Sequence, residues 1–261
     1  MCIRDRERGC YIPPGVEKHI SDVISAIPSR EISGRSSKIV AGAVLVVALL
    51  PYGIPQYMIA ERLGITVEWK TMSFDAIIVA VKNREIDLGV SGFSITPERL
   101  EEVLFTIPHT VTEVQLIMTQ ERASQLGIDK LTDLSDIAKY NLVVGTGSGT
   151  TQEDELLELV GKGVIPSASV KSYDSFDLAL EDMLRGVIDA VYAETPVTTW
   201  WTMTVDKPLV IVYARSYWPV AFVAHKDAHE LVAKINGVLA ELIAEGKVDQ
   251  LREKWSKPAS S

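Results

Sequence analysis

Cysteine is almost absent from this chain of 261 residues. Its two cysteines, Cys2 and Cys10, both lie within the first ten residues, so the rest of the chain cannot depend on a disulfide framework. An exported protein without disulfides would show this usage, and so would a cytosolic one. Cysteine therefore excludes a small disulfide-stapled fold and leaves the compartment open.

Basic residues are also too few for a protein that binds nucleic acid. Lys and Arg number 26 against 35 Asp and Glu, which gives a formal net charge of -9, and no stripe of Lys and Arg appears. Because nucleic-acid phosphates demand basic patches, we expect no nucleic-acid partner. The four histidines show no metal-ligand spacing with Cys, Asp or Glu, so we expect neither a metal nor a cofactor.

Long apolar runs are missing as well. Residues 39–50 are twelve apolar residues, too few for a transmembrane helix, which needs about 20. They match either the apolar region of a signal peptide or a strand covered on both faces. We favour the strand, because Pro51-Tyr-Gly53 then turns the chain into a helix from Pro55. A third arrangement makes residues 22–27 the first strand and 39–50 a helix, which the same prolines would break.

The most informative stretch is 86–99, which combines a strand, an open turn and a helix start. Ile86–Val90 predicts a buried strand that ends at Ser91-Gly92, where the backbone can approach a ligand closely. Thr96 suits the N-cap and Pro97 the first helical position, with Arg99 in the first turn. The hydroxyl and guanidinium then meet at a spot suited to a small anion. A capped surface helix with a solvated arginine is the alternative interpretation.

A second stretch, 140–151, has related chemistry. An apolar strand leads into Gly145-Thr-Gly-Ser-Gly149, and Thr150 with Glu153 predicts a capping box at the start of the next helix. Such a loop presents backbone N–H groups to an anion. It lacks the lysine of a phosphate-binding loop, and its spacing does not fit a dinucleotide fingerprint.

A third stretch places an acidic residue at the end of a strand. Residues 173–185 predict an amphipathic helix, and 186–194 a buried strand that ends in Glu194, where open α/β sheets place their ligands. Residues 73–91 repeat this order of a Phe-Asp helix start and an Ile-Asp strand. The chain therefore consists of two similar α/β halves.

From about Tyr52 to Trp255 these segments resemble the polar amino-acid-binding family of bacterial solute-binding proteins, family 3, which serve ABC importers. The resemblance implies a type II periplasmic-binding-protein fold, an α/β fold of two lobes. Each lobe is a mostly parallel sheet flanked by helices, two hinge crossings join them, and an amino acid is held in the cleft between them. The matching segments are 59–64, 73–75, 91–99, 105–108, 149–152, 188–190 and 246–255.

For the first lobe the resemblance implies a ligand-binding set around Arg99. This arginine would pair with the ligand α-carboxylate, which fits the two-pronged guanidinium. Ser94 would touch the same end of the ligand through its hydroxyl and backbone, and Gly92 through its backbone. Phe74 would cover the ligand, unless it is an ordinary core aromatic. Tyr52 is the candidate for an aromatic wall that the family otherwise supplies.

For the second lobe the resemblance implies that Thr151 meets the carboxylate and that Glu194 receives the α-ammonium. The family usually has aspartate at 194, so the extra methylene alters the pocket. Cyclohexadienyl (arogenate/prephenate) dehydratases share the fold, and there Glu194 would be a general acid that protonates a leaving hydroxyl. This enzyme is the alternative function; in the main interpretation no residue is catalytic. A second departure is His109, where the family commonly has tyrosine.

The expected domain layout follows from two crossings, near 114–118 and 220–224. Residues 39–114 and 219–261 would form lobe 1, and 115–218 lobe 2. Residues 1–38 would be an atypical leader, disordered or an artefact of gene assembly, without a clear export signal. We therefore expect a monomeric receptor, periplasmic or attached to the outer cell surface, that delivers its small-molecule ligand to the membrane permease of an ABC transporter. A sensor domain of a larger protein is the third and weakest alternative.

Overall fold

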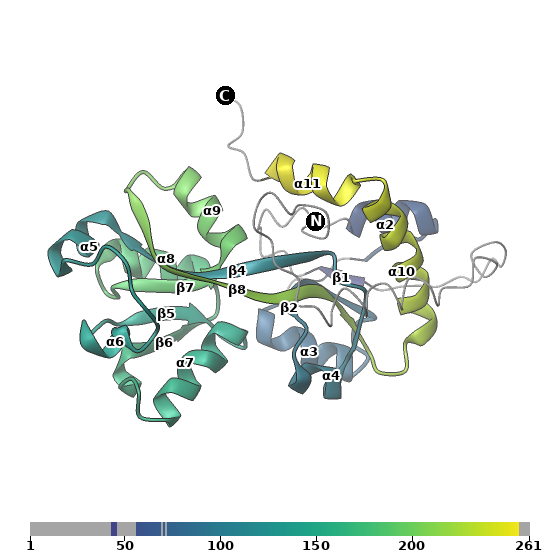
Figure 1. The fold of residues 1–261 in the computed structure, drawn as a ribbon. Coiled ribbons are helices and arrows are strands. Elements are labelled where there is room, and N and C mark those ends of the chain that lie inside the picture. The colour runs from purple at the N-terminus through teal and green to yellow at the C-terminus, as the bar shows by residue number, and fades with distance from the viewer. Residues whose placement is uncertain (1–42, 46–55, 69, 71, 256–261) are drawn as a thin grey trace. The chain divides into compact units, whose positions relative to one another are not determined.

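The computed structural model describes residues 43–45, 56–68, 70 and 72–255, which fall into two compact units (Figure 1). The first unit combines the elements before Met72 with Ala76–Val111 and Trp218–Trp255. The second contains Ser73–Asp75 and Thr112–Tyr217. Of the sequence predictions, the leader 1–38, Tyr52 and most of the run 39–50 lie outside the described residues.

Two strands carry the chain from one unit to the other. They are β4 (Thr110–Thr119) and β8 (Leu209–Ala224). β8 is longer than the predicted return strand, because it starts ten residues before Pro219 and continues through it. Proline has no N–H to donate, but its carbonyl still accepts a hydrogen bond, here from the Ile95 N–H at 3.0 Å.

The first unit contains a mixed sheet. β1 and β2 pair in parallel, whereas β8 pairs antiparallel with both β2 and β3. Its strands are β1 (Ala43–Leu45), β2 (Leu88–Ser94), β3 (Leu104–Phe105) and the later part of β8. Its helices are α2 (Gln56–Leu63), α3 (Phe74–Lys82), α4 (Pro97–Glu102), α10 (His229–Ala244) and α11 (Lys247–Trp255).

Alternation along β2 and β8 separates the two faces of this sheet. Leu88, Val90 and Phe222 face a core to which α2, α10 and α11 contribute. On the opposite face, a Cβ atom added at Gly89 would lie 2.7 Å from Ile77 Cγ2 of α3 and 2.6 Å from Val223 Cγ2. Only glycine therefore lets α3 pack this closely on the sheet.

Two predicted strands of the first unit differ in extent from those observed. β1 lies inside the predicted strand 39–50, and its three residues pair with Leu88–Val90. β2 does not end at Ser91-Gly92 but continues to Ser94, with an irregularity between Gly89 and Phe93 in its pairing with β8. The strand continues because Phe93 is fully buried and pairs with Ala221, which outweighs the break expected from Gly92.

The strands of the second unit continue the same eight-stranded sheet, in which β4 is the neighbour of β8. β5 pairs in parallel with β6 and with β7, and β4 pairs antiparallel with β7. The further strands of this unit are β5 (Val144–Gly147), β6 (Val170–Tyr173) and β7 (Ala190–Glu194). Its helices are α5 (Gln120–Leu126), α6 (Asp136–Lys139), α7 (Thr151–Gly161), the short 3₁₀ helix η2 (Ser167–Ser169), α8 (Phe176–Arg185) and α9 (Thr195–Thr204).

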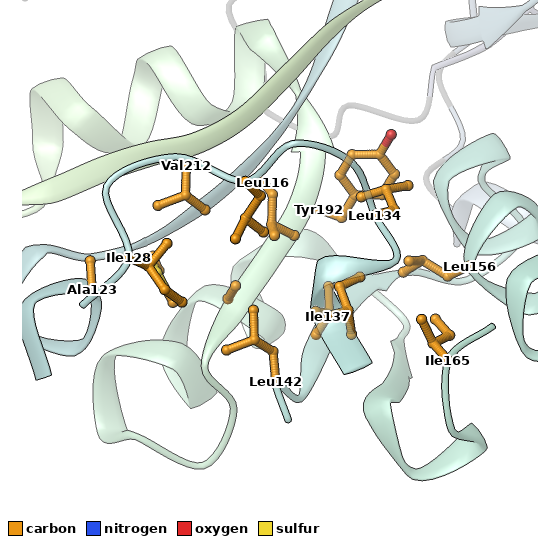
Figure 2. Packing of buried hydrophobic residues seen from close by; sticks show 14 of the residues in the cluster. Leu116, Ala123, Ile128, Leu134, Ile137, Leu142, Leu156, Ile165, Tyr192 and Val212 are labelled. Atoms are coloured by element: carbon orange, nitrogen blue, oxygen red, sulfur yellow. The ribbon is translucent and has the colours of Figure 1, made fainter. Parts of the chain in front are cut away.

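The core of this unit lies on one face of its sheet (Figure 2). Leu116 from β4 and Tyr192 from β7 pack with Leu156 of α7 and with Ile137 of α6. The amphipathic helix predicted at 173–185 is α8, which Ser175 caps by accepting from the Leu178 N–H at 3.3 Å. None of the helices within the described residues is long and apolar enough to cross a membrane.

Candidate functional site

In the first unit, the end of β2 and the start of α4 bring Ser94 and Arg99 together. Thr96 caps α4 as predicted, since its Oγ1 accepts from the Arg99 N–H at 3.3 Å, and Pro97 takes the first position. The guanidinium of Arg99 turns back, and its Nη1 donates to the Ser94 carbonyl at 3.2 Å. Arg99 is 8% exposed, so it is not the solvated arginine of a surface helix.

The hydroxyl of Ser94 is unusual for a buried polar group. Ser94 is 1% exposed, and within the described part of the chain its Oγ has no hydrogen-bond partner. Nearly all buried polar atoms in proteins have such a partner, so each exception calls for an explanation. A hydroxyl that contacts a bound molecule is one. Gly92 lies two residues earlier, buried in the irregular part of β2.

In the second unit, the glycine-rich loop leads into α7 as expected. The Thr150 Oγ1 accepts from the Glu153 N–H at 3.3 Å, which is one half of the predicted capping box. In the other half Glu153 reaches further back, because its Oε2 accepts from the Gly149 N–H at 2.7 Å. Gly149 has φ +72, a left-handed conformation that suits glycine. Thr151, the first residue of α7, is 5% exposed.

Gln152 is a candidate site residue that was missed from the sequence. It is 1% exposed, and its Nε2 has no hydrogen-bond partner among the residues that the structure describes. It follows Thr151 at the N-terminal end of α7. The sequence signal was present, since Gln152 closes the Gly-Thr-Thr-Gln segment, but a glutamine in a helix is more often solvated.

Glu194 ends β7 at the edge of the sheet where the loop after β5 leads into α7 and Thr151. β5 and β7 are parallel neighbours, so the carboxyl end of β7, at Glu194, and the loop after β5 lie at the same edge of the sheet. Glu194 is 5% exposed and is the N-cap of α9, but its side chain makes no capping hydrogen bond. A buried carboxylate that is not used as a cap lies at this edge.

The remaining predicted residues are less informative. Phe74 is half-buried and begins α3. His109 is fully buried, with its ring centroid 4.7 Å from that of Phe222. Burial lowers the pKa of His109 to about 3, so its imidazole is neutral. No group of three or more His, Cys, Asp or Glu among the described residues is arranged to hold a metal ion.

The structure thus brings Gly92, Ser94 and Arg99 together in the first unit. In the second it places Thr151 and Glu194 at one edge of a sheet. The buried guanidinium and hydroxyl of the first unit are suited to an anionic group. The helix N–H groups and the hydroxyl of the second unit are also suited to an anion, and its buried carboxylate is suited to a cation.

Comparison with known proteins gives a consistent picture. Residues 57–258 match the family model described as "Bacterial extracellular solute-binding proteins, family 3". The chain is similar to ABC transporter arginine-binding protein 1 of Escherichia coli (strain K12), with 27% identity over 189 residues, 70% of this chain and 71% of that protein.

Solved structures agree. An ancestral arginine-binding protein bound to arginine has 29% sequence identity and a TM-score of 0.66, covering 76% of this chain and 83% of the other. The ancestral amino acid-binding protein AncCDT-1, described as a precursor of cyclohexadienyl dehydratase, has 27% identity and a TM-score of 0.65, covering 77% and 82%.

Proposed function

Because the chain belongs to the bacterial extracellular solute-binding proteins, family 3, we propose that it captures an amino acid or a related zwitterion for an ABC importer. The observation that carries the proposal is the buried pair of Arg99 and Ser94. A guanidinium held at a strand end, beside a buried hydroxyl that has no partner among the described residues, supplies a positive charge and a further polar contact for a carboxylate.

The proposed roles follow the chemistry of each residue. Arg99 pairs with the α-carboxylate through two parallel N–H···O bonds, which lysine could not provide. Ser94 and Gly92 contact the same group, and Thr151 meets it from the second unit. Glu194 receives the α-ammonium. The proposal thus requires both units to contact a single ligand, and their closure around it would be a hinge motion about β4 and β8.

Phe74 is proposed to cover the apolar part of the ligand, since it is a half-buried aromatic residue at the start of α3. Tyr52 keeps its proposed role as an aromatic wall, although it lies outside the described residues. Gln152 joins the proposed set, because it follows Thr151 and its buried Nε2 has no partner among the described residues.

L-arginine is the first ligand to test, because two of the three similar proteins compared above are named for arginine. The glutamate side chain at 194, which is one methylene longer than aspartate, suits an extended cationic ligand as well as a standard α-ammonium. The same comparisons favour capture over the dehydratase, since the similar proteins are named as binding proteins.

We also propose the place of action and the partner. As a member of an extracellular family, the protein would work in the periplasm or at the outer cell surface. There it would act as a monomer and deliver its ligand to the membrane permease of an ABC transporter.

A ligand screen tests this function. Purified protein is heated with each of the twenty amino acids, and each hit is followed by calorimetry. A ligand that binds only the folded state adds about 2.7 kcal/mol at 100 times its Kd, so a true ligand raises Tm in a concentration-dependent way. Binding of L-arginine or another single amino acid supports the proposal. No Tm shift with any of them would reject it.

A further inference from the structure

Glu155 links three elements of the second unit through its two carboxylate oxygens. Its Oε2 accepts from the Tyr192 hydroxyl at 2.9 Å, and its Oε1 pairs with Arg215 Nη2 at 2.6 Å. The Glu155 side chain is 18% exposed, so this is not a fully solvated surface pair. Glu155 thereby ties α7 to β7 and to β8.

The position of Glu155 on α7 relates it to Thr151. The two residues are four apart in one helix, so they lie on the same face, one turn from each other. Any tilt or rotation of α7 that breaks the contacts of Glu155 would therefore move Thr151 too.

Tyr192 has the same relation to Glu194 on β7. The two residues are two apart in one strand, so their side chains leave the sheet on the same face. The Tyr192 ring is fully buried, and its oxygen points away from the aliphatic cluster, as Figure 2 shows. The hydrogen bond between Glu155 and Tyr192 thus lies one helical turn from Thr151 on α7 and two residues from Glu194 on β7.

A second connection closes a ring of contacts. The Thr150 hydroxyl donates to the Gly147 carbonyl of β5 at 2.7 Å, and the Thr146 hydroxyl of β5 donates to the Tyr192 carbonyl at 3.2 Å. The start of α7 is therefore connected to β7 by two routes, through β5 and through Glu155. Burial raises the pKa of Tyr192, so its hydroxyl keeps the proton that it donates to Glu155.

We propose that Glu155 is a positioning residue for ligand capture, which fixes Thr151 relative to Glu194 by holding Tyr192 and Arg215. This inference rests on the proposed function, since the position of Thr151 relative to Glu194 matters for capture only if both residues contact the ligand. The local claim, that Glu155 immobilises the first turn of α7, stands apart from the identity of the ligand.

Two variants on one helix separate positioning from general stability. Glu155→Gln removes the charge that holds Arg215 and weakens the bond from Tyr192. Glu158→Gln is the matched control. Glu158 also lies on α7 and pairs with Lys162, but it is three residues further from Thr151 than Glu155 is. Amide hydrogen exchange at residues 152–154 is measured in the ligand-free proteins, and the Kd of L-arginine is measured by calorimetry.

We expect Glu155→Gln to speed exchange of these amides at least fivefold and to raise the Kd about tenfold, as loss of a charge-assisted hydrogen bond predicts. Glu158→Gln should change neither more than twofold. Tyr192→Phe, which keeps the ring and loses only the hydroxyl, should also speed exchange of these amides. The double variant, Glu155→Gln with Tyr192→Phe, should differ little from Glu155→Gln in exchange rate or Kd.

Three outcomes are decisive. Equal exchange in Glu155→Gln and Glu158→Gln would overturn the inference, even if both lower Tm. Faster exchange with an unchanged Kd would overturn it as well, since Glu155 would then steady the helix without serving capture. If the wild type does not bind L-arginine but exchange differs as expected, the choice of ligand fails while the local claim stands. If Glu155→Gln does not fold, Tyr192→Phe decides by the same measurements.

Discussion

The Arg99 guanidinium donates to the main-chain carbonyl of Ser94, five residues earlier, at 3.2 Å. Thr96 sets the start of the helix between the two residues. The contact with Ser94 thus orients a buried guanidinium at the end of β2, which is the arrangement expected of a residue that binds a carboxylate.

Ser94 should show a trade between stability and binding. Ser94→Ala removes a buried hydroxyl that has no partner among the described residues, and such a group costs about 1–3 kcal/mol. We expect an unchanged or higher free energy of unfolding in urea, together with a Kd for L-arginine raised about three- to tenfold. Loss of stability without loss of affinity would assign the hydroxyl to the fold.

Glu194 distinguishes a receptor from an enzyme. Glu194→Gln converts a charge-assisted hydrogen bond to the ammonium into a neutral one, so the Kd of L-arginine should rise at least tenfold. Glu113→Gln, at an exposed glutamate of β4, is the control and should bind normally. Wild-type protein should not convert prephenate or arogenate. Turnover that Glu194→Gln abolishes while binding persists would establish the dehydratase instead.

His109 should make the protein sensitive to acid. Its pKa falls from an ordinary 6.5 to about 3 in the fold, because burial opposes the charged form. A lowered pKa means that the unfolded state takes up the proton first. Stability is therefore complete above pH 6.5 and declines towards pH 3, by up to about 1.4 kcal/mol per pH unit.

Replacement of His109 tests this directly. His109→Phe removes two ring nitrogens that are buried without a partner among the described residues and keeps an aromatic ring against Phe222. When urea unfolding is measured between pH 3 and 7, the free energy of unfolding should depend less steeply on pH, by up to about 1.4 kcal/mol per pH unit, and should be equal or higher at pH 7. His229→Asn, at an exposed histidine, is the control. An unaltered slope in His109→Phe would place the acid sensitivity elsewhere.

Two glycines should respond in opposite directions to alanine. At Gly89 the added Cβ would lie 2.6 Å from Val223 Cγ2 and 2.7 Å from Ile77 Cγ2, so Gly89→Ala should destabilise the protein by about 1–3 kcal/mol. At Gly161, at the end of α7, no atom of the described residues outside its own helix backbone and chain neighbours lies within 4 Å of that position. Gly161→Ala should stabilise by about 0.4–1 kcal/mol. Urea denaturation measures both, and similar values would refute the packing account of Gly89.

The sequence predicted what is encoded locally. The caps at Thr96 and Thr150, the proline after Thr96 and the glycine loop before α7 all depend on residues within four positions of each other. The two-lobed type II fold is confirmed by the family match and by the similar solved structures. The roles of the site residues stay predictions.

What the sequence could not give depends on contacts between distant residues. Glu155 is 37 positions from Tyr192, and nothing near either residue indicates that they meet. β2 continues past Gly92 because Phe93 finds a buried place beside β8, more than 120 residues later. The depth of His109 and the buried amide of Gln152 are likewise results of packing rather than of local pattern.

Arg99 carries the central claim, and calorimetric titration of L-arginine into the wild type and three variants tests it. Arg99→Ala leaves a buried carboxylate unpaired and should cost about 2–5 kcal/mol of binding. Arg99→Lys keeps the charge without the fork, and should recover only part of the affinity. Arg62→Ala, at an arginine of the same unit that pairs with Glu241 and Glu245, is the control. We predict a Kd at least 30-fold higher in Arg99→Ala, with Arg62→Ala unchanged; a folded Arg99→Ala protein that binds L-arginine within threefold of the wild type would contradict the account.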